Sequence, residues 1–339
     1  MNNEQPPSFN AIAKPVPRAL KSPVEIATHR WEAIPCVEVV VTKHLRTGDI
    51  IHGRGEGTAL FYRPETAEGL AQQINELAPH LTGSITRRDL LGLLPANGAR
   101  CALDAALWSL ETAESGVAAW QRAGLSALEP VLTAATVYLD TPARMAESAA
   151  QLAPHFPLIK VKLGASGDEE RIRAVRSAAP DAQLIVDANA GWSTDDLDAM
   201  TSALVDSCVT LVEQPLAPEH DAALDGYDGP LRLCADESFQ TIEDVERCRG
   251  RYQVLNIKLD KCGGLTSALA IADLAKVMGF DLMVGNMLGS SLGMAPAHLF
   301  AQLCILADLD GPLSLASDVT PAMTYAEGKA LPPPTELWG

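Results

Sequence analysis

Three apolar runs in this chain end in an acidic residue, and this repetition restricts the possible fold more than any other feature. The runs are Q-L-I-V-D, ending at Asp187, C-V-T-L-V-E, ending at Glu213, and L-R-L-C-A-D, ending at Asp236. The acids are 26 and 23 residues apart, and one strand, one helix and two short loops take roughly 25 residues. Consecutive parallel strands are usually neighbours. The spacing therefore predicts that the three acids meet at one end of a parallel sheet.

Three carboxylates at one point repel one another unless a cation lies among them. A set of oxygen ligands selects a hard divalent ion, Mg²⁺ before Zn²⁺. We therefore predict a Mg²⁺ site formed by Asp187, Glu213 and Asp236. The alternative is that each acid forms a separate structural salt bridge.

Strand-like and helix-like segments alternate regularly from about residue 133. Eight candidate strands with about seven helical crossovers in roughly 190 residues fit a parallel barrel, in which chemistry takes place at the carboxyl ends of the strands. The three acids fall at such ends. The candidate strands span residues 134–139, 158–163, 184–189, 209–214, 231–236, 254–259, 282–286 and 304–308.

The first 125 residues read as strands followed by helices, which is typical of an α+β domain. Residues 1–16 are polar and contain prolines, so we expect them to be disordered or loosely attached. Gly53, Gly55 and Gly57 precede L-F-Y rather than a helix start, so we interpret them as loop glycines and not as a dinucleotide-binding motif. Helices are predicted over residues 66–80, 85–93 and 99–112.

Two further strands carry lysine. Lys160 and Lys162 are two positions apart in L-I-K-V-K-L and therefore share a face, and Lys258 lies in V-L-N-I-K-L. The second and sixth strands of an eight-stranded ring lie on opposite sides, with the acids between them. A solvated sheet edge is the alternative for Lys160 and Lys162, and Lys261 is an alternative to Lys258.

A metal site flanked by two lysines suits one kind of chemistry. A carbon acid next to a carboxylate is very weak, and coordination of that carboxylate to Mg²⁺ stabilises the charge that develops on deprotonation. A lysine near a cation and a second lysine has a lowered pKa and can act as a base. One lysine can then remove a proton from one face while the other returns a proton to the opposite face. The predicted result is inversion at that carbon, with both stereoisomers as substrates.

Charge and composition exclude several other classes of protein. The net charge of −17 argues against nucleic acid and anionic membranes as partners, since both require basic patches. No run approaches about 18 apolar residues, and the N-terminus lacks an apolar signal core, so we expect neither a membrane span nor a secretion signal. Seven cysteines without a C-x-x-C pair indicate free thiols in a reducing cytoplasm.

The motifs K-V-K, D-A-N, E-Q-P, A-D-E-S and N-I-K-L-D-K-C-G-G-L together resemble the enolase superfamily, muconate-lactonizing subgroup. Within it, the chain is most similar to dipeptide epimerases of the L-Ala-D/L-Glu type, from about residue 18 onward. The resemblance implies an α/β fold, a modified (β/α)8 barrel of the form (β/α)7β with an α+β capping domain. The implied boundaries are a disordered segment at 1–17, the cap at 18–128, the barrel at 129–318 and a C-terminal segment at 319–339 that returns to the cap.

The resemblance also assigns the central roles to residues at matching positions. It implies that Asp187, Glu213 and Asp236 bind one Mg²⁺ per subunit. It implies that Lys162 and Lys258 are the acid/base pair.

Contacts with the substrate are implied in the same way. Lys160 would lie beside the substrate carboxylate and lower the pKa of Lys162. Thr136 is similar to a substrate-contacting threonine of the epimerases. Asp308 and Asp310 resemble a D-x-D motif that holds the free α-ammonium of a dipeptide, although D-G-P is also a plain turn signal.

Three other stretches bear on the substrate and the metal. The loop G-N-M-L-G-S-S-L-G could bind phosphate, as many barrels do after the seventh strand. We interpret it instead as close backbone approach to the substrate, with Met287 lining the pocket. Asn189 and Glu237 are expected beside the metal ligands rather than among them. Epimerases that prefer Ala-Glu tend to carry an arginine in the loop near residue 30, where it pairs with the glutamate side chain. Here Arg30 does not align cleanly with that arginine, and Trp31 is near the expected place.

The implied activity is Mg²⁺-dependent epimerisation of dipeptides by 1,1-proton transfer through a metal-stabilised enolate. The implied context is a cytoplasmic homo-oligomer that serves peptidoglycan recycling. Alternatives within the superfamily are an N-acylamino acid racemase, a muconate cycloisomerase and an o-succinylbenzoate synthase. A phosphate-binding barrel lyase is a more remote alternative. The D-x-D motif separates dipeptide epimerases from the lactonizing enzymes and the synthases, which have no such amine to bind.

Overall fold

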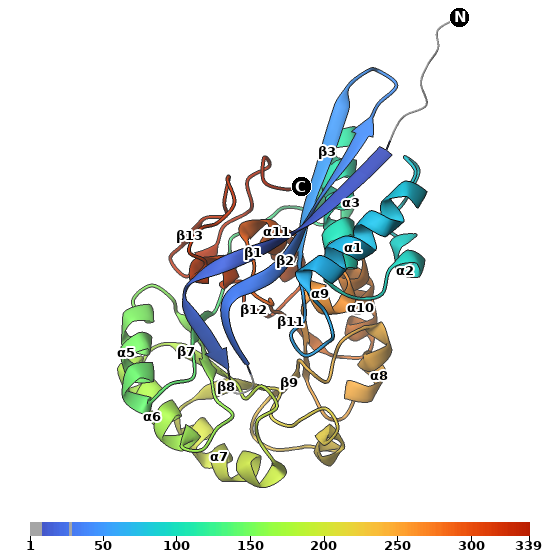
Figure 1. The fold of residues 1–339 in the computed structure, drawn as a ribbon. Coiled ribbons are helices and arrows are strands. Elements are labelled where there is room, and N and C mark those ends of the chain that lie inside the picture. The colour runs from blue at the N-terminus through green and yellow to red at the C-terminus, as the bar shows by residue number, and fades with distance from the viewer. Residues whose placement is uncertain (1–8, 27–28) are drawn as a thin grey trace, which may run out of the picture.

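A ring of eight parallel strands forms the larger part of the molecule (Figure 1). The computed structural model describes residues 9–26 and 29–339. The barrel strands are β5 (Ala135–Val137), β6 (Leu158–Lys162), β7 (Gln183–Asp187), β8 (Val209–Glu213), β9 (Leu233–Ala235), β10 (Val254–Ile257), β11 (Asp281–Val284) and β12 (Leu306–Ala307). They are neighbours in chain order from β5 to β12. The amide of Ala134 donates to the carbonyl of Ala307 at 2.8 Å, which joins the two ends of the sheet. The predicted parallel barrel is therefore confirmed.

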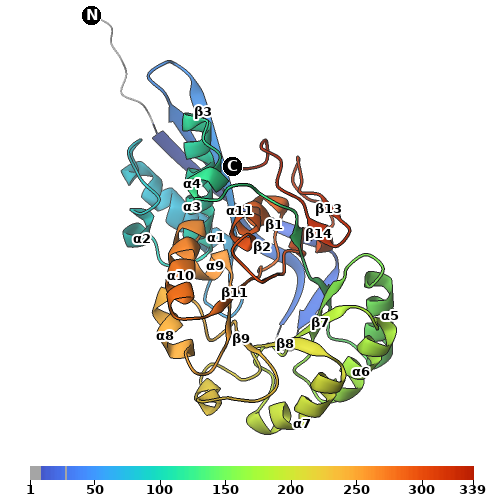
Figure 2. The same ribbon diagram turned by 180° about the vertical axis from the view of Figure 1, so that it is seen from behind.

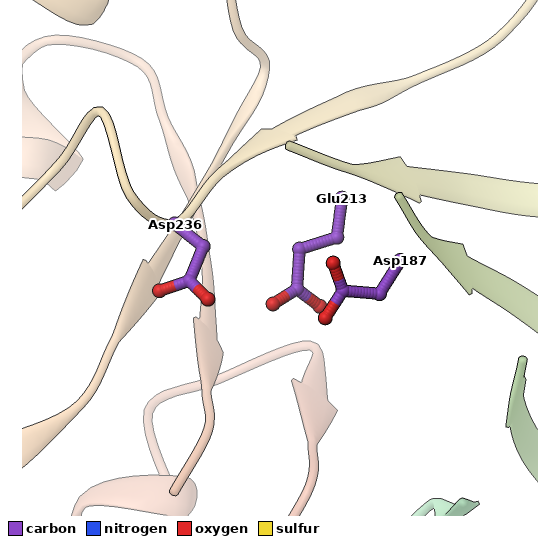
Figure 3. Close-up of side chains that lie close together, drawn as sticks. All are labelled: Asp187, Glu213 and Asp236. Carbon is purple, nitrogen blue, oxygen red and sulfur yellow. The ribbon is translucent and has the colours of Figure 1, made fainter. Parts of the chain in front are cut away.

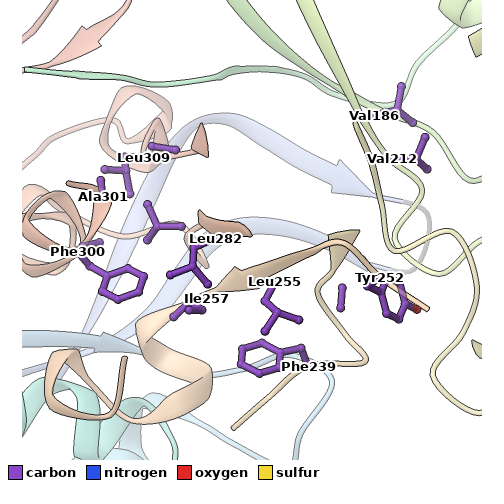
Figure 4. Packing of buried hydrophobic residues seen from close by; sticks show 14 of the residues in the cluster. Val186, Val212, Phe239, Tyr252, Leu255, Ile257, Leu282, Phe300, Ala301 and Leu309 are labelled. Atoms are coloured by element: carbon purple, nitrogen blue, oxygen red, sulfur yellow. The ribbon is translucent and has the colours of Figure 1, made fainter. Parts of the chain in front are cut away.

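Alternation along each strand decides which side chains face the inside of the barrel. In β7, Leu184 and Val186 belong to the outer apolar cluster that packs under the helices, part of which Figure 4 shows. Ile185, two positions before Asp187, belongs instead to a separate inner cluster. That inner cluster takes a side chain from the region of nearly every strand and fills the barrel interior: Ala134, Leu158, Ile185, Leu211, Cys234, Val254 and Met283.

Helices follow most of the barrel strands and surround the ring (Figure 2). A capping box begins the helix that follows β7, because Ser193 Oγ accepts from the Asp196 amide and Asp196 Oδ2 accepts from the Ser193 amide. The helices are α5 (Pro142–Leu152), α6 (Asp168–Ala178), α7 (Thr194–Asp206), α8 (Val245–Cys248), α9 (Leu259–Cys262), α10 (Leu265–Val277) and α11 (Ser291–Ala301), with 3₁₀ turns η2 (Asp221–Leu224), η3 (Ile242–Asp244) and η4 (Gly311–Ser314).

An antiparallel sheet with helices covers one end of the barrel (Figure 1). Its order is β1-β2-β3. The predicted helix over residues 85–93 is much shorter than expected. The elements are β1 (Phe9–Ile26), β2 (His29–His44), β3 (Ile50–Thr58), α1 (Ala67–Leu77), η1 (Ala78–His80), α2 (Leu90–Leu93), α3 (Gly98–Ser115) and α4 (Ala119–Arg122).

The first half of β1 corrects the expectation of disorder over residues 1–17. Residues 9–17 pair with β2 along their whole length, and Ala11 and Ala13 are buried. Pro15 and Pro17 do not prevent this, because β1 is an edge strand and an edge strand tolerates a missing N–H on its outer side. Residues 1–8 lie outside the described part of the chain.

The glycines of β3 are also not loop glycines. Gly53, Gly55 and Gly57 occupy every second position of β3 and face helix α3. A Cβ atom at any of the three would lie 2.0 Å from a carbonyl oxygen of α3. These positions therefore require glycine because the strand lies directly on the helix backbone.

The C-terminal segment contacts the capping helices. A third sheet joins β4 (Val131–Leu132) to β14 (Lys329–Ala330) and β13 (Tyr325–Ala326). Trp338 Nε1 donates to the carbonyl of Ala105 in α3 at 2.8 Å. Among the described helices, none is long and apolar enough to cross a membrane.

Candidate active site

The structure brings the three predicted acids together at the carboxyl end of the barrel (Figure 3). Asp187 and Glu213 are the last residues of β7 and β8, and Asp236 directly follows β9. One oxygen from each carboxylate lies within 4.8 Å of the others, and all three residues are buried. Burial of three carboxylates side by side requires nearby positive charge.

Lys160 supplies part of that charge. Its Nζ lies 3.0 Å from Asp187 Oδ2, 2.7 Å from Glu213 Oε2 and 3.0 Å from Asp308 Oδ2. Burial alone would lower the pKa of Lys160, but the surrounding carboxylates raise it well above its ordinary value. The family resemblance implied that this ammonium lies beside a substrate carboxylate. The structure places it among protein carboxylates, because it points into the same interior as the acids.

Lys162 and Lys258 lie on opposite sides of the three acids. Lys162 Nζ is 2.6 Å from Asp187 Oδ2, and Lys258 Nζ is 2.6 Å from Asp236 Oδ2. Three strands, β7, β8 and β9, separate β6 from β10 in the sheet. The predicted strand 254–259 ends two residues earlier than expected, at Ile257, so Lys258 directly follows the strand.

The charges of this cluster shift the pKa values of its members in different directions. Burial opposes ionisation of Asp187, but Lys160 and Lys162 hold the pKa of Asp187 below its usual range. Burial and then Asp187 raise the pKa of Glu213 to about 8.

Burial and the contact with Asp236 have opposite effects on the pKa of Lys258. Burial alone would lower it, but Asp236 raises the pKa of Lys258 above its ordinary value. The lowered pKa predicted from the sequence assumed a bound cation and a second lysine as neighbours, and it did not include the direct contact with the Asp236 carboxylate.

Two residues that the sequence argument did not assign hold the acids in place. Asn256 Nδ2 donates to Glu213 Oε1 at 2.8 Å, and Lys261 Nζ donates to Asp236 Oδ1 at 2.6 Å. Asn256 could have been found by alternation, since it lies two positions before Lys258 and so points inward. Lys261 follows the strand, and nothing in the strand pattern indicates its contact.

Asn189 and Glu237 lie beside the acids, as the sequence argument placed them. The backbone amide of Asn189 donates to Asp187 Oδ1 at 2.8 Å. Its side-chain Nδ2 lies 3.3 Å from both Asp187 Oδ2 and Glu237 Oε1. Burial and then Asp236 raise the pKa of Glu237 to about 7.

A cavity opens over the acids and is lined by both the barrel and the cap. Thr136 and Met287 line it, as do Trp31 and Tyr62 from the cap. Arg30 is not among the lining residues in the described part of the chain, and it pairs across the hairpin with position 25. The aromatic lining was not predicted, because it comes from cap segments without a repeated motif. The further lining residues include Phe61, Tyr138, Lys160, Lys162, Asn189, Asp236, Glu237, Lys258, Asn286, Asp308 and Asp310.

Asp308 and Asp310 form an acidic wall of this cavity. Asp308 Oδ2 faces Lys160, and Asp308 Oδ1 is buried without a hydrogen-bond partner among the described residues. Asp310 Oδ2 accepts from the Thr136 amide at 2.9 Å. Burial and then Asp308 raise the pKa of Asp310 to about 7. The wall therefore offers carboxylate oxygens to a cationic group.

Two backbone amides at the end of the glycine-rich loop, where α11 begins, already donate to carboxylates. The Ser290 amide donates to Glu56 Oε1 at 2.6 Å, and the Ser291 amide donates to Asp318 Oδ1 at 2.9 Å. Both carboxylates would repel a phosphate. The contacts argue against the remote alternative of a phosphate-binding lyase.

The donor set at the acids fits a hard divalent cation. It consists only of carboxylate oxygens, which Mg²⁺ prefers over the nitrogen and sulfur ligands that zinc takes. Glu213 Oε2 makes no hydrogen bond among the described residues, although Lys160 Nζ is near it. Fold and site together define a capped barrel enzyme with a candidate divalent-metal centre.

Comparisons with known proteins agree with this class. Residues 144–335 match the family described as Enolase C-terminal domain-like. L-Ala-D/L-Glu epimerase from Escherichia coli is 43% identical over 82% of this chain and 87% of that protein. N-acetyl-D-glutamate racemase from a Pseudoalteromonas species is 44% identical over 76% of this chain and 82% of that protein.

Solved structures show the same relationship. An enolase family member from Agrobacterium tumefaciens with homology to dipeptide epimerases, solved with bound sodium and L-Ala-L-Glu, superposes with a TM-score of 0.93. It is 38% identical over 98% of this chain and 100% of that chain. A dipeptide epimerase from Enterococcus faecalis, complexed with Mg and L-Leu-L-Tyr, has a TM-score of 0.86 and 26% identity over 96% of each chain. The chain belongs to the enolase superfamily.

Proposed function

We propose that this protein is a Mg²⁺-dependent dipeptide epimerase that acts on L-Ala-D/L-Glu and related dipeptides. One observation carries the proposal: Lys162 and Lys258 face each other across three converging carboxylates at the carboxyl end of the barrel. The relatives named above support the same activity.

The proposed roles follow from the positions of the side chains. Asp187, Glu213 and Asp236 would hold Mg²⁺, which when bound neutralises charge on a substrate carboxylate. In its neutral form, Lys162 or Lys258 takes the proton from the α-carbon on its own side.

The remaining roles complete one turnover. The opposite lysine, as ammonium, returns a proton to the other face, so that the configuration inverts. Asp308 and Asp310 accept hydrogen bonds from the α-ammonium of the dipeptide. Thr136 and Met287 line the pocket around it.

Exchange in D₂O tests this assignment directly. With L-Ala-L-Glu in D₂O, we expect deuterium at the α-carbon of the glutamate residue and accumulation of the D epimer. Lys162→Ala and Lys258→Ala are each expected to lose epimerisation by about 10²- to 10⁴-fold. Each variant should still exchange the α-proton of the one epimer that its remaining lysine faces. The exposed Lys276→Ala variant is the control, and exchange of both epimers by either active-site variant would refute the two-lysine assignment.

N-acetyl-glutamate racemisation is a second candidate function, because one relative at 44% identity carries that name. The acidic wall of Asp308 and Asp310 favours a free ammonium over an acetylated nitrogen. The same exchange assay with N-acetyl-D-glutamate distinguishes the two. Faster exchange of the acetylated substrate than of the dipeptide would assign the second function.

The same proposal covers the setting of the enzyme. We propose one Mg²⁺ per subunit, since the described residues form one cluster of three such acids. We propose a cytoplasmic location, supported by the seven free cysteines. A homo-oligomeric state and a role in peptidoglycan recycling rest on the family resemblance.

A further inference from the structure

The side chain of Gln214 joins the ends of two barrel strands behind the acid cluster. Its Oε1 accepts from the amides of Asp236 and Ser238 at 2.9 and 3.0 Å. Its Nε2 donates to the Leu216 carbonyl at 2.6 Å and also lies 2.8 Å from Ser238 Oγ and 3.1 Å from the Tyr252 hydroxyl. Gln214 is completely buried, and the described cavity-lining residues do not include it. Its side chain therefore lies outside the cavity that opens over the acids.

These contacts continue the sheet where its backbone pairing stops. The ladder between β8 and β9 ends at the pair Glu213 and Cys234, and Asp236 lies two residues beyond it. The Gln214 amide donates to the Cys234 carbonyl at 2.8 Å, and its side chain then reaches the Asp236 amide. The side chain thus continues the hydrogen bonding of the ladder as far as Asp236. Figure 3 shows the Asp236 carboxylate beside those of Asp187 and Glu213.

The backbone of Gln214 is unusual in a way that fits this task. Its φ is +34°, a region that residues with a side chain rarely adopt. Such conformations persist where the surroundings hold them in place, and they cluster at functional sites. Here the turn directs the side chain away from the cavity and toward the Asp236 turn, while Glu213, one residue earlier, points inward.

We propose that Gln214 is a positioning residue that sets the separation of Glu213 and Asp236, and through it the affinity of the cluster for a divalent cation. The inference rests on the metal site of the proposed function. Residues that orient metal ligands typically change metal affinity by about 10- to 100-fold when they are replaced.

A matched control exists at the opposite end of β9, the strand that precedes Asp236. Gln253 Oε1 accepts from the amide of Leu233, the first residue of β9, at 2.8 Å. Gln214→Met and Gln253→Leu each remove a glutamine that bonds to the backbone at one end of β9. Only the first touches a proposed metal ligand. Gln214→Asn, which keeps the amide but is one methylene too short, provides a second variant in case the methionine variant does not fold.

The experiment measures Mg²⁺ binding by calorimetry and Mn²⁺ binding by electron paramagnetic resonance in the full-length enzyme, with thermal unfolding in EDTA as the measure of folding. We expect Gln214→Met and Gln214→Asn to weaken binding of both ions by about 10- to 100-fold. Gln253→Leu should lower the Tm in EDTA and leave both affinities within twofold of the parent.

Four results would overturn the inference: unchanged affinity in the Gln214 variants, equal weakening by Gln253→Leu, failure of both Gln214 variants to fold, or a parent enzyme that binds neither ion. Failure of the proposed function looks different. In that case the parent binds Mg²⁺ and the Gln214 variants weaken it, but no dipeptide exchanges its α-proton.

Discussion

At the scale of single residues, lysine ammonium groups and carboxylates form a network of ion pairs inside this barrel. Lys160 touches three carboxylates, and Lys162 and Lys258 each touch one of the proposed metal ligands. Each of the three lysines forms its ion pairs with protein carboxylates. The positions of the two outer lysines are thus set by the same acids that would bind the metal.

Substrate side-chain preference is a residue-scale question that centres on Arg30. This residue is exposed in β2 and is not among the described residues that line the cavity, but it directly precedes Trp31, which lines it. We expect Arg30→Ala to raise the KM for L-Ala-L-Glu by about tenfold, equivalent to about 1.4 kcal/mol, with little effect on L-Ala-L-Ala. Steady-state kinetics with both dipeptides measure this, and Arg46→Ala in the distant turn is the control. Equal increases for both dipeptides would reject a role for Arg30 in binding the glutamate side chain.

His298 predicts a pH dependence of stability. It is fully buried in α11, its Nε2 lies 3.1 Å from the Ala330 carbonyl, and burial lowers the pKa of His298 from 6.5 to about 4. The unfolded chain therefore binds a proton below about pH 6.5, whereas the folded protein does so only near pH 4. The stability contributed by neutral His298 is complete above pH 6.5 and is lost as the pH falls toward 4.

Urea unfolding of the parent and of His298→Gln at pH 7.5 and pH 4.5 checks this prediction. Over that interval the parent should lose about 2 kcal/mol more than the variant, because each unit of pKa difference corresponds to about 1.4 kcal/mol. Other titrating groups cancel in the comparison. Parallel losses in the two proteins would show that His298 does not contribute.

At the scale of elements, the barrel strands were predictable and parts of the cap were not. A buried parallel strand is a short apolar run, so β7, β8 and β9 could be recognised, together with the acids at their ends. β1 was missed because its pairing depends on an edge position that the sequence does not reveal. The supporting contacts of Gln214 and Lys261 were missed because they connect segments that only the folded ring brings together.

The packing of β3 on α3 leads to an element-scale prediction. Two residues of a strand advance about 6.7 Å and four residues of a helix about 6.0 Å, so every second strand position meets successive turns of the helix. A methyl group at Gly55 would lie 2.0 Å from the Ala102 carbonyl oxygen, and backbone atoms cannot move aside as a flexible side chain could.

We expect Gly55→Ala to lower the free energy of unfolding by about 3 kcal/mol or more, measured by urea denaturation. Gly92→Ala is the matched control, because no atom lies within 4 Å of a Cβ at that position in α2. The control should be neutral or slightly stabilising, since alanine favours helix. If Gly55→Ala lowered the free energy of unfolding by less than about 1 kcal/mol, β3 and α3 would be able to move apart to accommodate a methyl group.

At the scale of the whole molecule, cap and barrel share a buried seam along α3. Arg100 donates to the carbonyls of Cys262 and Gly263 at 2.7 and 3.2 Å. Thr266 Oγ1 donates to Asp104 and accepts from Trp108 Nε1, the latter at 3.0 Å. If cap and barrel separated, the buried polar groups of this seam would lose their hydrogen-bond partners. We therefore expect the two parts to unfold together.

Thr266→Val tests whether the seam makes the molecule one cooperative unit. The variant leaves the Trp108 indole N–H and one Asp104 oxygen without their partner, which costs about 1–3 kcal/mol for a buried group. We expect a lower midpoint in urea, with far-ultraviolet and near-ultraviolet circular dichroism still changing in a single shared transition. Thr201→Val, which removes a hydroxyl bonded only within α7 to Leu197, is the control and should shift the midpoint less. Separate transitions for the two signals in the parent would show that cap and barrel do not unfold as one cooperative unit.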